Sequence, residues 1–134
     1  MSARSKARKR ALDLIYAAEM RGRSAVDALE EQQSSGPVNE YTVRLVHGVD
    51  EHRARLDEVV ASYAQGWSLA RMPAVDRNVL RLATYEVLYE DDVPDAVAVS
   101  EAVNLVRDLS TDESPAFVNG VLGNIVRDRA SLAG

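Results

Sequence analysis

The chain of 134 residues contains no cysteine, one tryptophan and one phenylalanine. Without cysteine it can form no disulfide framework, no thiolate metal site and no redox centre. No segment approaches the roughly 20 apolar residues that a membrane-spanning helix needs. The first apolar run is broken by Asp13 and Glu19 and lacks the cleavage site of a signal peptide. These absences predict a reducing, cytoplasmic location and no membrane association.

The sequence also lacks the common catalytic motifs. It has no nucleophile elbow, no phosphate-binding loop and no Gly-rich dinucleotide turn. His47 and His52 lie five residues apart, which turns their rings about 140° away from each other on a helix. We expect His47 to be half-buried and His52 to be exposed. The acidic pairs 91–92 and 112–113 stand at predicted helix starts, where carboxylates favour the helix dipole. We therefore expect no enzyme activity, metal or cofactor.

Apolar residues at helical spacing predict an all-α fold in one compact domain over residues 1–134. Ser24, Asn39 and Asp95 are expected to cap three of the helices, and Gly22 to end the first one. No alternating pattern or hairpin signal indicates a β-strand. The predicted helices cover residues 4–21, 24–33, 39–64, 74–89, 95–110 and 112–129. Gly48 and the charged residues 50–53 are expected to bend or split the third helix, and the helix over 74–89 is expected to be central because apolar residues surround it.

The predicted helix over residues 112–129 has Asp112 and Ser114 as candidate N-caps and Pro115 in its first turn. Gly120 and Gly123 interrupt its apolar stripe, and each costs about 1 kcal/mol relative to alanine. Either a neighbouring backbone packs closely against them, which is the ordinary reason, or a ligand approaches there. In the connector 66–73, we expect Trp67 and Leu69 to pack on the core.

The net charge of −5 is unevenly distributed along the chain. Residues 1–23 hold seven basic and two acidic side chains, whereas the remainder holds nine basic and nineteen acidic ones. Most of the basic residues lie on one face of the first predicted helix, with Tyr16 beside them, while Arg4 and Arg8 project onto its apolar side. This pattern indicates a site for a polyanion, with a ring on which an unpaired base could stack. A solvated charged tail is the alternative, and the first ten residues are expected to overhang the core or to be disordered without a ligand.

Three stretches, in this order, resemble the NusB family of transcription antitermination factors. They are the Arg-rich start leading to LIY (residues 14–16), AVDRNVLRLATYEVLY (residues 74–89) and DVPDAVAVSEAVNLVRDLSTDESPAFVNGVL (residues 92–122). The last stretch, which ends in FVNGVL, is the most specific. The resemblance spans nearly the whole chain and is weakest between residues 24 and 66.

The resemblance implies a fold of two small helix bundles packed together, with about six to seven helices and no catalysis. It also implies binding of boxA-type single-stranded RNA together with the ribosomal protein NusE, and indirect contact with RNA polymerase and other elongation factors during transcription of ribosomal RNA operons. The family's RNA surface corresponds here to Arg4, Lys6, Arg8, Lys9, Arg10, Tyr16, Glu113, Ser114 and Phe117. Its NusE surface corresponds to Asp76, Tyr85 and Glu86.

The sequence departs from the family pattern at Pro115–Ala116, where a polar or basic pair is common, so a phosphate contact can be missing there. Some family members form homodimers that hide the RNA surface, and the sequence leaves that question open. Two other interpretations also stay open. A similar domain serves as an accessory module of ribosomal RNA methyltransferases, and a helical adaptor that binds protein but no RNA would show the same composition.

Overall fold

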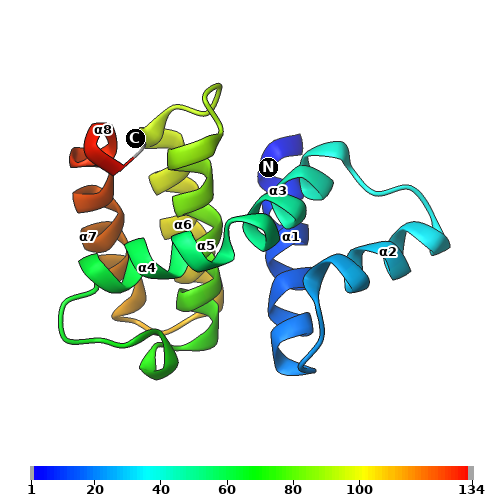
Figure 1. Ribbon diagram of the computed structural model, residues 1–134, viewed down its shortest axis with the longest axis horizontal. Helices are drawn as coiled ribbons and strands as arrows, with labels where there is room; N and C mark the ends of the chain where they lie inside the picture. The colour runs from blue at the N-terminus through cyan, green and yellow to red at the C-terminus, as the bar shows by residue number, and fades with distance from the viewer. Residues whose placement is uncertain (1, 133–134) are drawn as a thin grey trace. The chain divides into compact units, whose positions relative to one another are not determined.

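The computed structural model describes residues 2–132, and every regular element within that range is a helix (Figure 1). The prediction of an all-α fold is confirmed. Among these residues, no helix combines the length and the apolar character needed to cross a membrane. The elements are α1 (Ala3–Met20), α2 (Ala25–Ser35), α3 (Glu40–Glu51), α4 (Arg53–Tyr63), the 3₁₀ helix η1 (Leu69–Arg71), α5 (Ala74–Tyr89), α6 (Asp95–Leu109), α7 (Ser114–Arg127) and α8 (Arg129–Leu132).

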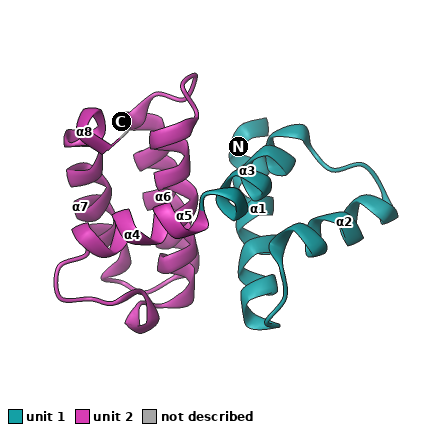
Figure 2. Ribbon diagram, in the orientation of Figure 1, with its two compact units in different colours: residues 1–52 teal, residues 53–134 magenta. Residues whose placement is uncertain are grey.

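The chain divides into two compact units, residues 1–52 and residues 53–134 (Figure 2). The helix predicted over residues 39–64 is split, as expected, because α3 ends at Glu51 and α4 begins at Arg53. This break coincides with the boundary between the units. The single domain predicted over residues 1–134 stays a prediction, and each unit is described below by itself.

Capping residues set the ends of the helices in the N-terminal unit. Gly22 has φ of 64°, a conformation that ends α1 and that glycine adopts without strain. The Ser24 hydroxyl accepts the backbone N–H of Val26 at 3.1 Å, and Oδ1 of Asn39 accepts the N–H of Tyr41 at 2.7 Å. The three predicted signals at positions 22, 24 and 39 are therefore confirmed.

The first turns of α1 belong to the packed part of the N-terminal unit. Ala7 and Ala11 are buried, and the hydroxyl of the buried Thr42 on α3 donates to the Ala7 carbonyl at 3.0 Å. The expectation that these turns overhang the core is therefore wrong. A small side chain at position 7 lets the two helices approach closely enough for this hydrogen bond. Further buried apolar residues of this unit are Leu12, Ile15, Ala18, Leu29, Leu45, Val46 and Val49.

Helix α5 is the central helix of the C-terminal unit, as its sequence predicted. It contacts α4, α6, α7 and α8, and twelve of its sixteen residues are buried. One of its ion pairs reaches α4, where Arg81 Nε lies 2.7 Å from Oδ1 of Asp57 and Arg81 Nη2 lies 3.2 Å from Oδ2. This two-pronged pair fixes α4 against α5.

Two of the predicted helix starts need correction. Pro94, not Asp95, occupies the N-cap position of α6, and Asp95 is its first residue. At α7 the N-cap position belongs to Glu113, whose side chain makes no capping bond, and Ser114 is the first helical residue. Pro115 does stand in the first turn, as predicted. Ser114 is not a cap because its hydroxyl bonds to a neighbouring helix instead.

The expectation that a neighbouring backbone packs closely against the glycines of α7 is also wrong. Gly120 and Gly123 are exposed, and a Cβ atom built on either one would meet nothing within 4 Å. The connector before α5 differs from expectation too, since Trp67 is 52% exposed and does not pack in the core. Exposed small residues and an exposed indole therefore both belong to the surface of the C-terminal unit.

Candidate nucleic-acid interface

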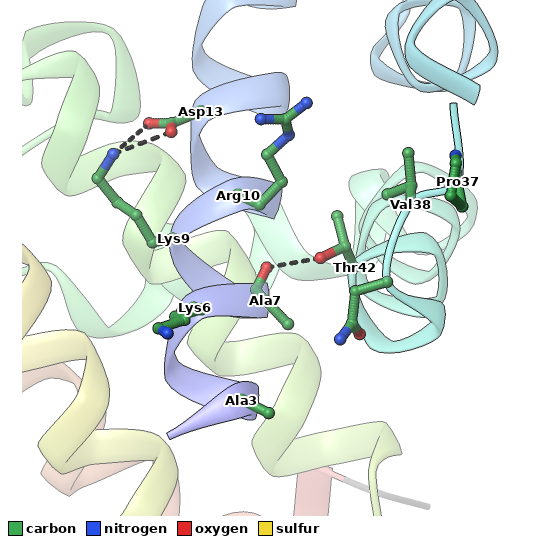
Figure 3. Close-up of a pocket in the computed structure, with 10 residues that line it drawn as sticks. Ala3, Lys6, Ala7, Lys9, Arg10, Asp13, Pro37, Val38 and Thr42 are labelled. Carbon is green, nitrogen blue, oxygen red and sulfur yellow. Dashed lines mark hydrogen bonds and ion pairs between the residues drawn. The ribbon is translucent and has the colours of Figure 1, made fainter. Parts of the chain in front are cut away.

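A basic groove of about 560 Å³ runs along the N-terminal half of α1 (Figure 3). Three of the predicted RNA-binding residues, Lys6, Lys9 and Arg10, line its α1 wall. The opposite wall comes from the segment that enters α3. The complete lining is Ala3, Lys6, Ala7, Lys9, Arg10, Asp13, Pro37, Val38, Asn39 and Thr42. The groove thus presents three cations beside a short apolar wall.

Hydrogen bonds fix the two walls of this groove relative to each other. The Thr42–Ala7 bond joins α3 to α1 at the bottom of the groove (Figure 3). Asn39 caps α3, so the direction of the chain between Pro37 and Asn39 is set by the helix that follows. A groove with fixed walls binds a ligand without first paying the entropy of ordering its own backbone.

The cations of the groove differ in their surroundings. Lys6 and Arg10 are exposed, and Arg10 donates through Nη2 to the side-chain carbonyl of Gln32 on α2. Lys9 is half-buried and forms an ion pair with Asp13 at 2.9 Å, one turn further along α1. Lys6 and Arg10 are therefore the more accessible positive charges for phosphate groups.

Arg8 does not line the groove. It is only 3% exposed, and its guanidinium carbon lies 5.6 Å from the centre of the Tyr41 ring. Arg8 is therefore buried in this conformation, and its contact with RNA stays a prediction. The helical spacing had placed Arg8 on the apolar side of α1, and that placement is confirmed. Arg4 is half-buried, with its guanidinium 4.1 Å from the same ring centre.

Tyr16 lies further along α1 and is 37% exposed. It is not among the residues that line the groove. Its ring is open to solvent on the basic helix, so stacking of a base on Tyr16 stays a prediction.

The remaining predicted RNA-binding residues belong to the C-terminal unit. Glu113, Ser114 and Phe117 line a second pocket, of about 690 Å³, at the start of α7. The rings of Trp67 and Phe117 lie 6.3 Å apart between centroids and are tilted by 60°. The other lining residues are Arg71, Met72, Pro73, Asp76 and Thr111. Two rings, one guanidinium and several hydrogen-bonding groups therefore surround one aromatic pocket.

A hydroxyl and carboxylate network forms the polar floor of the aromatic pocket. Ser110 and Ser114 donate to Oδ1 and Oδ2 of Asp76 at 2.6 and 2.8 Å, and the hydroxyls of Thr111 and Ser114 lie 2.8 Å apart. Ser114 and Asp76 are 1% and 2% exposed. Because these groups bond to one another, Ser114 positions the start of α7, and its contact with RNA stays a prediction.

The predicted NusE-binding residues are all buried. Besides Asp76, Tyr85 is 7% exposed and donates its hydroxyl to Glu90 Oε2 at 2.7 Å, and Glu86 is 1% exposed. All three lie on α5, whose polar residues are packed together with its apolar ones. All three are buried in this structure, and their contacts with NusE stay a prediction.

Several lining residues were not predicted from the sequence. Trp67 was expected in the core, and Arg71 and the segment 37–39 carried no RNA-binding assignment. A single tryptophan in a loop between two helices is the one signal that could have suggested a surface ring. Nothing in the sequence indicated which loop would lie across the groove from α1, because that depends on tertiary packing.

The two histidines line neither the basic groove nor the aromatic pocket. His47 is exposed and His52 is half-buried, the reverse of the expectation. Within residues 2–132, no group of three histidine, aspartate or glutamate side chains is arranged to hold a metal ion.

The helical fold, the basic groove and the aromatic pocket together define a small all-α protein of the nucleic-acid-binding kind. The chain belongs to the NusB family of transcription antitermination factors, whose family model matches residues 5–127. It is 66% identical to the transcription antitermination protein NusB of Nocardioides sp. over 99% of this chain and 100% of that protein. It is 58% identical to the protein of that name from Saccharopolyspora erythraea, over 100% and 96% of the two chains.

Two solved structures show the same fold. NusB of T. maritima is 32% identical and superposes with a TM-score of 0.86, over 97% of this chain and 94% of that one. A crystal structure of the antitermination factors NusB and NusE in complex with dsRNA contains a chain that is 26% identical, with a TM-score of 0.81, over 92% of this chain and 96% of that one. The family resemblance drawn from the sequence is therefore confirmed.

Proposed function

We propose that the protein binds boxA-type single-stranded RNA together with NusE and thereby promotes processive transcription of ribosomal RNA operons. The basic groove of α1 is the observation that carries this proposal. Lys6, Lys9 and Arg10 supply the positive charge that phosphates require, on a helix whose position is fixed by the Thr42–Ala7 bond. The proposal includes no catalytic step and places the protein in the cytoplasm.

The aromatic pocket supplies a second contact in this proposal. An unpaired base stacks on Phe117 or on the exposed ring of Trp67, while Glu113 offers a carboxylate to the edge of the base. Stacking on an aromatic ring contributes about 1–3 kcal/mol per base and tolerates any sequence. Stacking alone therefore explains affinity but not selectivity for boxA, which we assign to the complex with NusE.

The charge of the C-terminal unit supports a basic protein partner. Residues 53–134 contain thirteen acidic and eight basic side chains. Since Asp76, Tyr85 and Glu86 are buried, NusE would contact exposed acidic residues of this unit. The related structure that holds NusB, NusE and RNA supports the same pairing for this chain.

Fluorescence-anisotropy titration tests the proposal. Labelled boxA-type RNA, a scrambled strand and a duplex of the same sequence are titrated at two salt concentrations, with and without purified NusE. We expect tighter and sequence-selective binding of the single strand when NusE is present, and affinity that falls steeply with salt. Preference for the duplex would replace the single-stranded ligand with a double-stranded one. No binding under any condition would leave a helical protein adaptor as the better account.

A paired set of variants locates the contact in the groove. Replacing Lys6 and Arg10 with alanine should make the negative slope of log K against log salt shallower by about 1.4, since each phosphate contact on a single strand contributes about −0.7. Arg107→Ala removes an exposed arginine that bonds to Asn104, one turn away on α6, and it should change neither slope nor affinity. Equal behaviour of both variants would remove the groove from the proposal.

A further inference from the structure

The aromatic pocket has two walls that come from segments distant in sequence. One wall is the connector before α5, which carries Trp67, and the other is the start of α7, which carries Phe117. The two ring centroids lie 6.3 Å apart at a tilt of 60°, within the range of a direct aromatic contact. The rings therefore form one continuous aromatic surface, which lasts as long as the two walls keep their separation.

Arg77 on α5 holds the connector wall. Its Nη1 atom donates to the carbonyl oxygen of Leu69 at 3.0 Å and to that of Met72 at 3.1 Å. Leu69 is the first residue of η1, and Met72 follows its last residue. A single guanidinium nitrogen therefore joins both ends of η1 to α5, a few residues after Trp67.

Asp76 on α5 holds the other wall. Its carboxylate accepts the hydroxyl of Ser110 at 2.6 Å and that of Ser114 at 2.8 Å. Ser110 follows the last residue of α6 and Ser114 is the first residue of α7, so one carboxylate fixes both ends of the turn between these helices. Phe117 lies three residues after Ser114, on the neighbouring turn of the same side of α7.

Asp76 and Arg77 are adjacent in the chain, and this adjacency explains how they reach both walls. Successive side chains on an α-helix point about 100° apart, so two neighbouring residues contact two different segments. Asp76 is buried and Arg77 is half-buried, and the bonds described above join each of them to the protein itself. One turn of α5 therefore sets the distance between the connector and the start of α7.

We propose that Asp76 and Arg77 are positioning residues of the aromatic pocket, which hold Trp67 and Phe117 together as one stacking surface for a base. This inference rests on the proposed function, since the base belongs to the RNA. Asp76 acts through the two serines, and Arg77 acts through the backbone of the connector. Base stacking at the pocket therefore depends on two residues that the base does not touch.

NMR of the protein without RNA tests the role of Arg77. The chain has one tryptophan and one phenylalanine, so a nuclear Overhauser effect between an indole and a phenyl ring identifies the Trp67–Phe117 contact without ambiguity. Arg77→Ala should lose this signal, because the connector is no longer tied to α5. Arg77→Lys can still donate to both carbonyls and should restore the signal. Arg107→Ala serves as the control for loss of an arginine.

The same signal tests the role of Asp76. Asp76→Ala removes the acceptor of both serines and should lose the signal between the rings. Since Asp76 is buried, Ser110→Ala provides a milder second variant, which removes one of the two bonds and should weaken the signal. Ser62→Ala is its matched control, because this exposed hydroxyl donates to the Glu58 carbonyl within α4. Circular dichroism and the thermal midpoint select the variants that fold.

RNA binding shows whether the positioning serves the ligand. Folded Arg77→Ala should bind RNA about fivefold to a hundredfold more weakly, the contribution of one stacked base. The slope of log K against log salt should not change, because stacking releases no counterions from phosphates. In a Phe117→Leu background, Arg77→Ala should weaken binding no further, since the ring that it positions is already absent. Additive losses would show that Arg77 acts outside the pocket and would overturn the proposal.

The remaining outcomes separate this inference from the proposed function. A ring signal that persists in folded Arg77→Ala and Ser110→Ala means that neither residue positions the rings, and the proposed function then stands without this inference. Loss of the signal with unchanged RNA affinity also overturns the inference, because the ring pair would not serve RNA. If the wild-type protein binds no RNA with or without NusE, the proposed function fails and the stacking role fails with it.

Discussion

The ammonium nitrogen of Lys9 lies 2.9 Å from both carboxylate oxygens of Asp13, one turn apart on α1 (Figure 3). Both residues line the basic groove. Asp13 therefore neutralises part of the charge that the groove offers to phosphates. Because the side chains are 37% and 54% exposed, the pair is screened by water and contributes little to folding stability. Its larger effect is on the electrostatic potential of the groove.

Asp13→Asn should therefore bind RNA more tightly than the wild-type protein. We expect a gain of about twofold to fivefold at low salt, in line with the strength of exposed ion pairs, and a smaller gain at high salt because salt screens exposed charges. Anisotropy titration measures both. Glu30→Gln removes an equal charge from an exposed position on α2 outside the groove and should have a smaller effect. Equal gains for the two variants would mean that net charge matters and the position of Asp13 does not.

Local signals in the sequence were sufficient to predict most of the fold. Ser24, Asn39 and Gly22 act through bonds or dihedral angles within a few residues of themselves, so their roles could be read from the chain. The boundaries of α5 were predicted without error, because apolar residues recur at helical spacing throughout residues 74–89 and Pro73 precedes them. The same reasoning predicted the break between α3 and α4.

The site was predicted less completely, because its residues depend on neighbours distant in sequence. Helical spacing showed which face of α1 holds Arg8, but not that Tyr41 would lie beside it. The resemblance placed Asp76 on the NusE surface, yet two serines from the α6–α7 region bond to its carboxylate in the interior. Trp67 was expected to pack on the core, yet it is 52% exposed. The burial of both residues is decided by the partners that the fold supplies, which the local sequence does not show.

The exposed glycines of α7 lead to a prediction about stability. Gly120→Ala and Gly123→Ala should each stabilise the protein by about 0.5–1 kcal/mol, since alanine loses less backbone entropy in a helix and the added methyl group meets open space. Urea unfolding measures the change. Gly22→Ala should instead destabilise the protein by about 1–2 kcal/mol, because alanine is strained at a φ of 64°.

The same glycine variants test whether a ligand approaches α7. If RNA or NusE contacts this face, the more stable variants should bind it more weakly, because the methyl groups would keep the ligand at a distance. Loss of stability in Gly120→Ala or Gly123→Ala would contradict the open surface seen around both residues.

Trp67 provides an intrinsic reporter for the aromatic pocket, because it is the only tryptophan of the chain and is 52% exposed. We expect RNA to quench its emission and to protect it from acrylamide. Phe117→Leu keeps an apolar side chain but removes the ring, so it should weaken RNA binding by about 1–3 kcal/mol if a base stacks there. Emission that is unchanged at saturating RNA would exclude the pocket as a base-binding site.

A hydrogen-bonded group at the C-terminal end of α7 predicts how stability depends on pH. The Tyr63 hydroxyl donates to Oδ2 of Asp128 at 2.6 Å, and Nε of Arg127 donates to Oδ1 at 3.2 Å. Bonding to Tyr63, and then to Arg127, holds the pKa of the Asp128 carboxyl below its usual 3.8. The bond to Asp128, and then burial, raises the pKa of Tyr63 above 10.0.

These two shifts stabilise the folded state over a defined pH window. A lowered carboxyl pKa stabilises the protein above the unfolded pKa of about 4, and this stabilisation is lost as the pH falls through the folded value. A raised tyrosine pKa stabilises the protein below about pH 10, and this stabilisation is lost as the pH rises through the folded value. Between these limits both groups favour folding, so the hydrogen bond contributes in full near neutral pH.

Tyr63→Phe should therefore destabilise the protein at pH 7 and have a smaller effect at pH 3, where protonation of Asp128 in the unfolded state has already removed part of the advantage. NMR titration should show a higher pKa for Asp128 in the variant than in the wild type, because its principal hydrogen-bond donor is gone. Tyr16→Phe removes an exposed hydroxyl from α1 and should leave the Asp128 titration unchanged. An Asp128 pKa that is the same in Tyr63→Phe and the wild type would assign the shift to Arg127, which remains in place in both proteins.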